Sequence, residues 1–130
     1  MRYWDTLLER DQDGFQIVID KTWEDVHPSD CFDTSIDPDT GLPYYDVAQM
    51  CEDIDSGKLD WFVLRARVFA KGVELGSATC GGLLYEDARD SVNDVGEDLV
   101  LDALVEGRDR LTYLAREFTM LTIKYSEETV

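Results

Sequence analysis

Two apolar segments separated by one Lys-Gly pair constrain the fold of this chain more than any other feature. The segments are residues 61–70 (WFVLRARVFA) and 73–85 (VELGSATCGGLLY), with Lys71-Gly72 between them. Both segments are rich in residues that favour strands, and a two-residue connection with glycine second is typical of a β-hairpin. The sequence therefore predicts an antiparallel hairpin with a bulge or bend at Gly81-Gly82.

Side-chain alternation along this hairpin predicts one apolar face and one mixed face. With the turn at Lys71-Gly72, the expected pairs are Val68–Leu75, Leu64–Thr79, Arg67–Gly76 and Arg65–Ala78. The apolar face then carries Phe62, Leu64, Ala66, Val68, Val73 and Leu75. The opposite face carries Trp61, Arg65, Arg67 and Phe69. A second copy of the chain covering this opposite face would form a homodimer.

The rest of the chain predicts one further strand and several helices. Residues 3–10 are expected to form one or two helical turns, residues 11–14 a turn, and residues 15–23 a strand. Residues 24–45 contain all three prolines and predict a long loop rich in proline and aspartate. Helices are expected at residues 44–56, ending at Gly57, and at residues 86–95, ending near Gly96. Residues 97–121 predict a long helix with a stripe formed by Leu101, Leu104, Arg108, Leu111, Ala115 and Phe118.

These elements predict a single α+β domain over residues 1–130. Its small antiparallel sheet would consist of strand 15–23 and the 61–85 hairpin, with helices packed on one face, including the long C-terminal helix. The chain is 44% apolar, which is enough for a core. It has no apolar run long enough for a membrane span and no recognisable signal peptide, and its three cysteines are odd in number and widely spaced. We therefore expect reduced thiols and a cytoplasmic location.

The net charge of −17 is concentrated in two segments. Residues 20–60 contain twelve acids and two bases, a balance of −10, and residues 86–109 contain nine acids and two bases, a balance of −7. The remainder is neutral. Such acidity argues against direct binding to nucleic acids or anionic membranes, because phosphate binding relies on Lys and Arg. The expected partner is instead a basic protein or complex, such as a nucleic-acid-binding protein.

The second acidic segment has a regular spacing that suggests a binding surface. Carboxylates recur every four residues, which on a helix is a rise of about 6 Å, close to the repeat of phosphates along a nucleic-acid strand. The candidate partner-binding residues in this segment are Glu86, Asp87, Asp90, Asp94, Asp98, Asp102 and Glu106. A second candidate patch lies in the long loop and comprises Asp30, Asp33, Asp37 and Asp39. Tyr44 and Tyr45 are candidate aromatic anchors beside the loop, whereas Trp23 is expected in the core.

The sequence supports a catalytic or metal-binding function less well than a binding surface for a basic partner. His27 lies four residues before Cys31, but no third residue is evident to orient such a pair, so we expect no catalytic residue and no enzyme activity. Acids at residues 9, 11 and 13 followed by Gly14 resemble the start of an EF-hand loop, but Asp20 stands where the bidentate glutamate belongs. We expect no cofactor and no specific metal site. Calcium binding, an adaptor or immunity protein for a basic partner, and halophilic or solubility adaptation stay open as alternatives.

Several strings of the sequence carry a broader resemblance. Over residues 15–118 the chain resembles small acidic accessory proteins of bacteriophages, prophages and mobile elements. The resemblance rests on the strings DKTWED, DPDTGLPYYD, DWFVLRARVF and ELGSATCGGLLYED and on the acidic helical C-terminus. Members of that class include anti-restriction and anti-CRISPR proteins that mimic DNA. The resemblance implies an inhibitor that occupies the basic groove of a host defence protein. It identifies neither a particular family nor a particular target.

Overall fold

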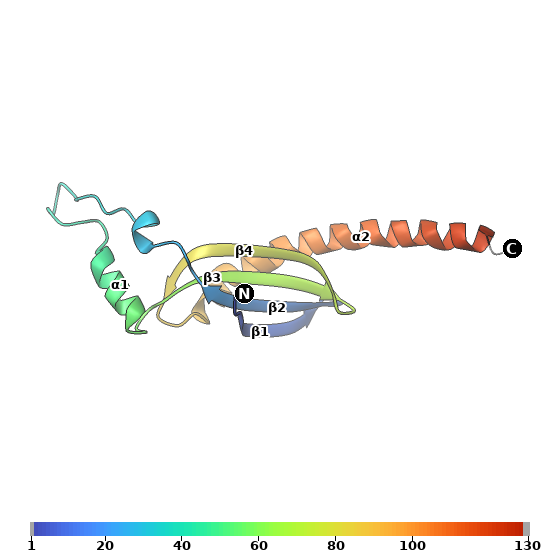
Figure 1. Cartoon of the computed structure of the whole chain (residues 1–130), viewed down its shortest axis with the longest axis horizontal. Coiled ribbons are helices and arrows are strands. Elements are labelled where there is room, and N and C mark those ends of the chain that lie inside the picture. Colours follow the sequence, from blue (N-terminus) through green and yellow to red (C-terminus); the bar gives the residue numbers. More distant parts are fainter. Residues whose placement is uncertain (1, 129–130) are drawn as a thin grey trace.

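A computed structural model describes residues 2–128 of the chain, in which four strands form one antiparallel sheet in the order β1-β2-β3-β4. A long helix, α2, packs on one face of the sheet and then extends beyond it (Figure 1). The elements in chain order are β1 (Asp5–Gln12), β2 (Phe15–Trp23), the 3-10 helix η1 (Pro28–Asp30), α1 (Val47–Asp55), β3 (Asp60–Ala70), β4 (Val73–Tyr85), the π-helical turn η2 (Val92–Gly96) and α2 (Glu97–Glu128). The α+β class, the antiparallel sheet and the long C-terminal helix are confirmed. None of the described helices is long and apolar enough to cross a membrane.

The sheet has one strand more than the sequence predicted. Residues 3–10 were expected to be helical, which is wrong, because Asp5–Gln12 pairs with β2 as strand β1. Asp13 and Gly14 have φ angles of 55° and 84°, the left-handed values that a tight two-residue hairpin turn requires. This turn reverses the chain immediately before Phe15, so the residues that precede it form a strand antiparallel to β2. The strand predicted over residues 15–23 is confirmed as β2.

The β3–β4 hairpin is confirmed, but its predicted register is wrong beyond the first two pairs. Ala70 pairs with Val73 and Phe69 with Glu74 as expected, and a bulge then shifts the ladder by one residue, so that Val68 pairs with Gly76. The bulge lets Gly76 lie directly against α2, where a Cβ atom would be only 2.3 Å from the carbonyl oxygen of Ala103. A second irregularity falls at the expected glycines, since Leu64 pairs with Cys80 and Phe62 with Leu83.

The core lies between one face of the sheet and the first half of α2. Its fully buried members on the sheet are Ile17, Ile19, Phe62, Leu64, Ala66 and Val68. From α2 they meet Leu99, Val100, Ala103 and Leu104. Phe62, Leu64, Ala66, Val68 and Leu75 are thus correctly predicted, whereas Val73, also expected there, is 54% exposed because it lies at the hairpin turn.

The opposite sheet face is covered largely by residues of the same chain. Asp20 is 1% exposed and accepts hydrogen bonds from Arg65 at 2.9 and 2.7 Å and from Arg67 at 2.8 Å. The Trp4 ring stacks on the Arg65 guanidinium at 3.7 Å. Trp61 is buried and donates its indole N–H to the carbonyl oxygen of Val26 at 2.8 Å. Trp61 and Arg65 are two of the four side chains that a second copy would cover in the expected homodimer, and both already pack against residues of the same chain.

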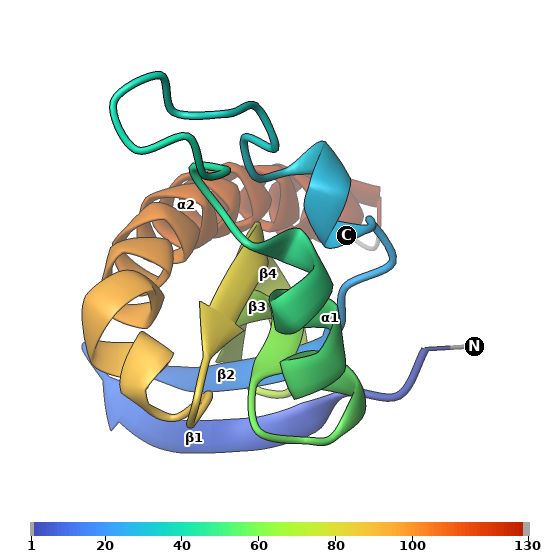
Figure 2. The same ribbon diagram turned by 90° about the vertical axis from the view of Figure 1, so that its left-hand side faces the viewer.

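Helix α1 and the long loop lie at one end of the sheet (Figure 2). The Asp46 carboxylate caps α1 by accepting the Gln49 N–H at 3.1 Å, so the helix begins at Val47 rather than at Tyr44. Gly57, with a φ of 81°, follows its end as predicted. The apolar residues of α1 recur at helical spacing and are half-buried; they are Val47, Met50, Cys51 and Ile54.

The C-terminal helix differs from the prediction in two ways. The expected break near Gly96 is wrong, because the chain passes through the single π turn η2 directly into α2, which ends seven residues later than predicted. Of the six predicted stripe residues only Leu104 is buried. The helix turns a face with small residues to the sheet, and a Cβ on Gly107 would lie 3.2 Å from a Val68 methyl group.

Candidate functional site

Three carboxylates form a row on the solvent side of α2. Asp98, Asp102 and Glu106 are all exposed, while Leu99, Ala103 and Leu104 fix the other side of the helix on the sheet. Four residues of helix rise about 6 Å, so the carboxylates repeat at that interval. We call these three residues the anionic row.

The anionic row forms no ion pair within residues 2–128. Glu106 and Arg110 are four residues apart on the helix, a spacing that suits an ion pair, but they form none. Like charges at i, i+4 spacing destabilise a helix by a few tenths of a kcal/mol per pair, so the row opposes helix formation slightly. The packing of the opposite side of α2 offsets this cost and leaves the three carboxylates available to a partner.

The first half of the acidic segment differs from the short helix that was predicted over residues 86–95. Glu86 and Asp87 lie in the turn after β4, and the π turn η2 shifts the helical phase between Asp90 and Asp98. Glu86 and Asp90 are exposed, and their carboxylates form no hydrogen bond or ion pair in the described part of the chain. The carboxylates that precede residue 98, although four residues apart in sequence, therefore do not lie in line with the anionic row.

Two acids of this region are held by internal contacts. Asp87 accepts the Arg89 guanidinium at 2.9 and 3.2 Å and the Arg89 backbone N–H at 3.0 Å, and these bonds lower the pKa of the Asp87 carboxyl. Tyr85 donates its hydroxyl to Asp94 at 3.1 Å. Burial, and then this bond to Asp94, raise the pKa of Tyr85. Asp87 and Asp94 thus stabilise the turn and the start of the helix through these hydrogen bonds.

The loop aspartates stabilise the turns of their own segment. Asp33 accepts the Ser35 hydroxyl at 2.6 Å and the Ser35 N–H at 2.9 Å, which lowers the pKa of Asp33. Asp37 is half-buried and accepts the Asp39 N–H at 2.9 Å. Asp30 and Asp39 are exposed. The loop projects from one end of the molecule, whereas α2 begins against the sheet and runs to the other end (Figure 1), so the structure does not merge the two acidic patches into one.

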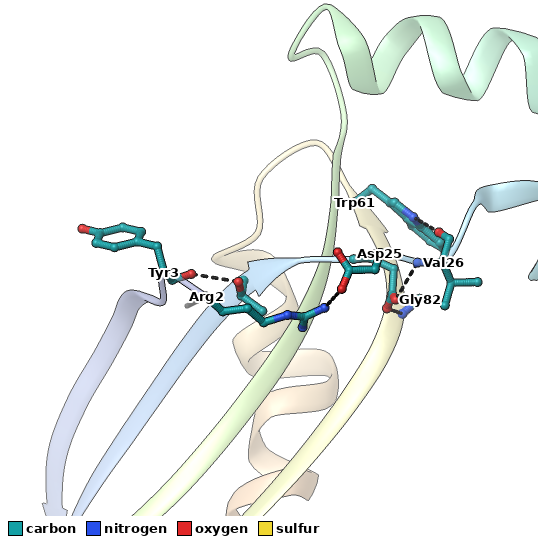
Figure 3. A network of polar contacts seen from close by, with 8 residues as sticks. Arg2, Tyr3, Asp25, Val26, Trp61 and Gly82 are labelled. Atoms are coloured by element: carbon teal, nitrogen blue, oxygen red, sulfur yellow. Dashed lines mark hydrogen bonds and ion pairs between the residues drawn. The ribbon is translucent and has the colours of Figure 1, made fainter.

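The base of the loop is fixed to the sheet by contacts that the sequence did not indicate. Glu24 accepts the backbone N–H of Gly82 at 2.8 Å and that of Val26 at 3.1 Å, and Arg2 pairs with Asp25 (Figure 3). The Arg2 guanidinium also lies 5.9 Å from the Trp23 ring. Trp23 is 50% exposed, so its expected place in the core is wrong. Because strand β2 ends at Trp23, the chain leaves the sheet there.

Trp23 lines an open cleft of about 720 Å³ beside the start of the acidic segment. The end of α1 and the 86–89 turn form the walls, and a Lys21–Asp60 ion pair lies among its lining residues. Glu86, Asp87 and Arg89 also line this cleft. With acids and bases interspersed, the cleft offers no concentrated charge of one sign.

A cysteine and the single histidine do meet, although not the pair expected from sequence. Cys51 Sγ lies 3.7 Å from His27 Nε2, whereas the sequence suggested Cys31. The Ser29 backbone N–H donates to His27 Nδ1 at 3.1 Å, so the neutral ring carries its proton on Nε2. Nε2 is then unable to accept the thiol proton of Cys51, and the pair lacks the arrangement of a general base and its nucleophile.

The residues that resembled an EF-hand loop form no such loop. Glu9 and Asp11 lie in strand β1, and Asp13 pairs with Arg108 at 2.9 Å. In the 37–41 segment the Gly41 N–H closes a turn onto the Asp37 carbonyl at 2.8 Å. Across residues 2–128, no group of three His, Cys, Asp or Glu side chains is placed to hold a metal ion.

Comparison with known proteins adds no relative. No protein-family model, curated protein or solved structure matches this chain.

Proposed function

We propose that this chain is a non-enzymatic inhibitor whose anionic row mimics nucleic-acid phosphates and occupies the basic groove of a nucleic-acid-binding protein. The observation that carries the proposal is the row itself: Asp98, Asp102 and Glu106 are exposed, have no ion-pair partner among the described residues, and are about 6 Å apart on an anchored helix. The sequence resemblance to phage accessory proteins selects the target class, which is a bacterial restriction or CRISPR complex.

Anchoring of α2 supports this role because a preorganised surface loses less entropy on binding. Arg10 on β1 donates two hydrogen bonds to Glu97, at 2.6 and 2.8 Å, and so ties the first turn of α2 to the edge strand. One residue later the row begins at Asp98. The row therefore presents its carboxylates at fixed intervals before any partner arrives.

Electrostatics supports the same role through the rate of association. Opposite charges on two surfaces steer them together, and this attraction weakens as salt shortens the Debye length. The protein carries −17 overall, so a groove lined with Lys and Arg attracts it from a distance. We expect target binding to weaken strongly between about 50 and about 500 mM salt.

The loop is the second part of the proposed interface. Asp30, Asp33 and Asp39 are exposed there, next to Tyr44 and Tyr45, which are 52% and 45% exposed. The Tyr45 ring lies 5.0 Å from Phe32, which in turn lies 5.8 Å from Trp61. These ring contacts connect the loop to the sheet and support Tyr45 as an aromatic anchor.

A pair of charge-reversal variants tests the proposal. The row-reversal variant carries Asp98→Lys, Asp102→Lys and Glu106→Lys, and the loop-reversal variant carries Asp30→Lys, Asp33→Lys and Asp39→Lys. Both change the net charge equally, so a difference between them reports position rather than total charge. Bacteria that express each chain with a panel of restriction or CRISPR systems are scored by phage plating, and the purified chain is then titrated against DNA binding by the responsive complex.

We expect the wild-type chain to restore plating against one system and to displace DNA at a fixed stoichiometry. The row-reversal variant should lose this activity, and the loop-reversal variant should retain more of it. Equal activity of wild type and row-reversal variant would refute the row as the binding surface. Turnover of a substrate instead of fixed stoichiometry would refute the non-enzymatic mechanism.

A further inference from the structure

The face of α2 that packs on the sheet continues past the sheet as an exposed apolar stripe. Val100, Leu104 and Gly107 are buried against the sheet at steps of four and three residues. The same steps lead on through Leu111, Leu114, Phe118 and Leu121, which we call the distal stripe. Leu114 is half-buried, but Leu111, Phe118 and Leu121 are 41%, 61% and 60% exposed. In Figure 1 this half of the helix extends away from the strands.

Alternating steps of three and four residues are the pattern of helices that pack together as a coiled coil. Residues 111–127 extend about 25 Å at 1.5 Å per residue. A helix of this length gains most of its stability from packing of its apolar face, and alone in water it is marginal. The spacing and the exposure together indicate that a second helix covers the distal stripe.

The charge of this segment identifies the second helix. Residues 111–127 contain two bases, Arg116 and Lys124, and two acids, Glu117 and Glu127, so the segment is neutral in a chain of −17. Neither a basic protein nor a nucleic acid is attracted to a neutral apolar surface by charge. A second copy of the same segment meets no repulsion there, and it supplies the same repeat of apolar residues.

We infer that two copies of this chain associate through their distal stripes as an antiparallel helix pair. The direction follows from the position of the sheet, which occupies the same side of α2 as the stripe. In a parallel pair the two sheets would lie between the two helices and would overlap. In an antiparallel pair each sheet lies at its own end, which also separates the two acidic bodies.

The antiparallel arrangement has a defined register. With Phe118 opposite Leu121 of the second copy, Glu117 lies beside Lys124 of the second copy on the flank of the interface. The symmetry of the pair repeats both contacts. Flanking pairs of opposite charge select partner and orientation in coiled coils. This interface uses α2 alone and is independent of the proposed binding role of the anionic row.

Sedimentation velocity of the full chain, from about 10 to about 500 μM, tests the inference over the range of weak dimers. The wild type should shift from monomer to dimer as the concentration rises. Leu121→Glu buries a carboxylate twice in the interface and should weaken the dimer about 100-fold or more. Met120→Glu is the matched control, because Met120 is 61% exposed and lies off the stripe, so this variant should dimerise like wild type.

The orientation has its own test. Glu117→Lys and Lys124→Glu should each weaken the homodimer several-fold, because each places like charges together, and an equimolar mixture of the two variants should restore dimerisation. A parallel pair has no Glu117–Lys124 contact, so an unchanged dimer in both variants would overturn the antiparallel register. A wild-type chain that stays monomeric at every concentration, or equal weakening by Leu121→Glu and Met120→Glu, would overturn the dimer itself. Circular dichroism and tryptophan fluorescence verify that each variant is folded.

Discussion

The two halves of α2 differ in packing and charge although they belong to one continuous helix. The proximal half, residues 97–110, is buried on one side by the sheet and carries the anionic row on the other. The distal half, residues 111–127, is neutral, and most of its large apolar side chains are exposed. Burial in the proximal half fixes the carboxylates in place. The distal half keeps the apolar spacing beyond Leu114, which still packs on the core, and there the large apolar side chains are exposed. This difference is the reason why we propose a different partner for each half.

The largest expected difference between the halves is in core packing. Leu104→Ala removes a side chain that is 2% exposed and should lower the free energy of unfolding by about 2–5 kcal/mol. Leu121→Ala changes a residue that is 60% exposed, and in the monomer it should cost less than about 0.5 kcal/mol. Urea unfolding at a concentration below dimerisation measures both. Equal losses would mean that the distal half is part of the folding core.

The close approach of the proximal half to β4 is the next contrast. Gly76→Ala places a methyl group 2.3 Å from a backbone oxygen of α2, and the backbone is unable to move as a flexible side chain would. We expect a loss of about 1–3 kcal/mol from the strain of overpacking. Ser77→Ala is the neighbouring control, because Ser77 is exposed on the same strand. If Gly76→Ala matched Ser77→Ala in urea unfolding, the tight contact would be disproved.

Much of the fold could be predicted because it depends on local spacing. Alternation around Lys71-Gly72 predicted the hairpin and most of its buried face, and the run from Phe15 predicted β2 correctly. Strand β1 was missed because its own alternation is weak, and only its partner β2 and the Asp13-Gly14 turn make it a strand. The predicted stripe of α2 shares Leu104, Leu111 and Phe118 with the face that the structure turns to the sheet, but at every second position it is one residue too late. Gly107 was passed over because a glycine has no apolar side chain, although its small size is what lets the helix approach Val68.

The candidate site could be predicted only in part. The four-residue spacing correctly placed Asp98, Asp102 and Glu106 on one side of a helix. The same spacing did not place Glu86 and Asp90 in line with these three residues, because a π turn after residue 91 rotates the direction in which later side chains point from the helix. In the sequence, this turn has the same glycine signal as a helix end. The contacts of Asp87 with Arg89 and of Asp94 with Tyr85 could not be predicted, because they form only once the chain has adopted the turn after β4.

The Arg10–Glu97 contact offers a smaller, pH-dependent test of how the proximal half is anchored. The hydrogen bonds from Arg10 lower the pKa of Glu97, so the carboxylate stabilises the fold above its unfolded pKa of about 4.3. This contribution is lost as the pH falls through the lower pKa of the folded state. Glu97→Gln should therefore cost up to about 1 kcal/mol at pH 7, with a smaller cost at pH 3.

Urea unfolding of both chains at the two pH values measures this difference. Because the other carboxyls protonate alike in wild type and variant, the comparison isolates Glu97. A cost that stays constant or grows toward pH 3 would contradict the assigned role of the ion pair.

The smallest expected effect is that of the row-reversal variant on stability. The three lysines keep the like-charge repulsion at i, i+4 that the three carboxylates had, and a lysine at position 98, near the helix N-terminus, opposes the helix dipole, so the variant should be slightly less stable. The free energy of unfolding should therefore change by less than about 1 kcal/mol. A larger loss in urea unfolding would mean that the row is needed for folding, and a loss of inhibition would then have a structural cause.

The most direct test of the account is a titration of DNA binding by the responsive defence complex with three purified chains: wild type, row-reversal variant and Leu121→Glu. If the proximal half binds the target and the distal half binds a second copy, Leu121→Glu should inhibit as well per chain as wild type does, and the row-reversal variant should not inhibit. Inhibition by the row-reversal variant at the potency of wild type, with loss of inhibition in Leu121→Glu, would contradict the account.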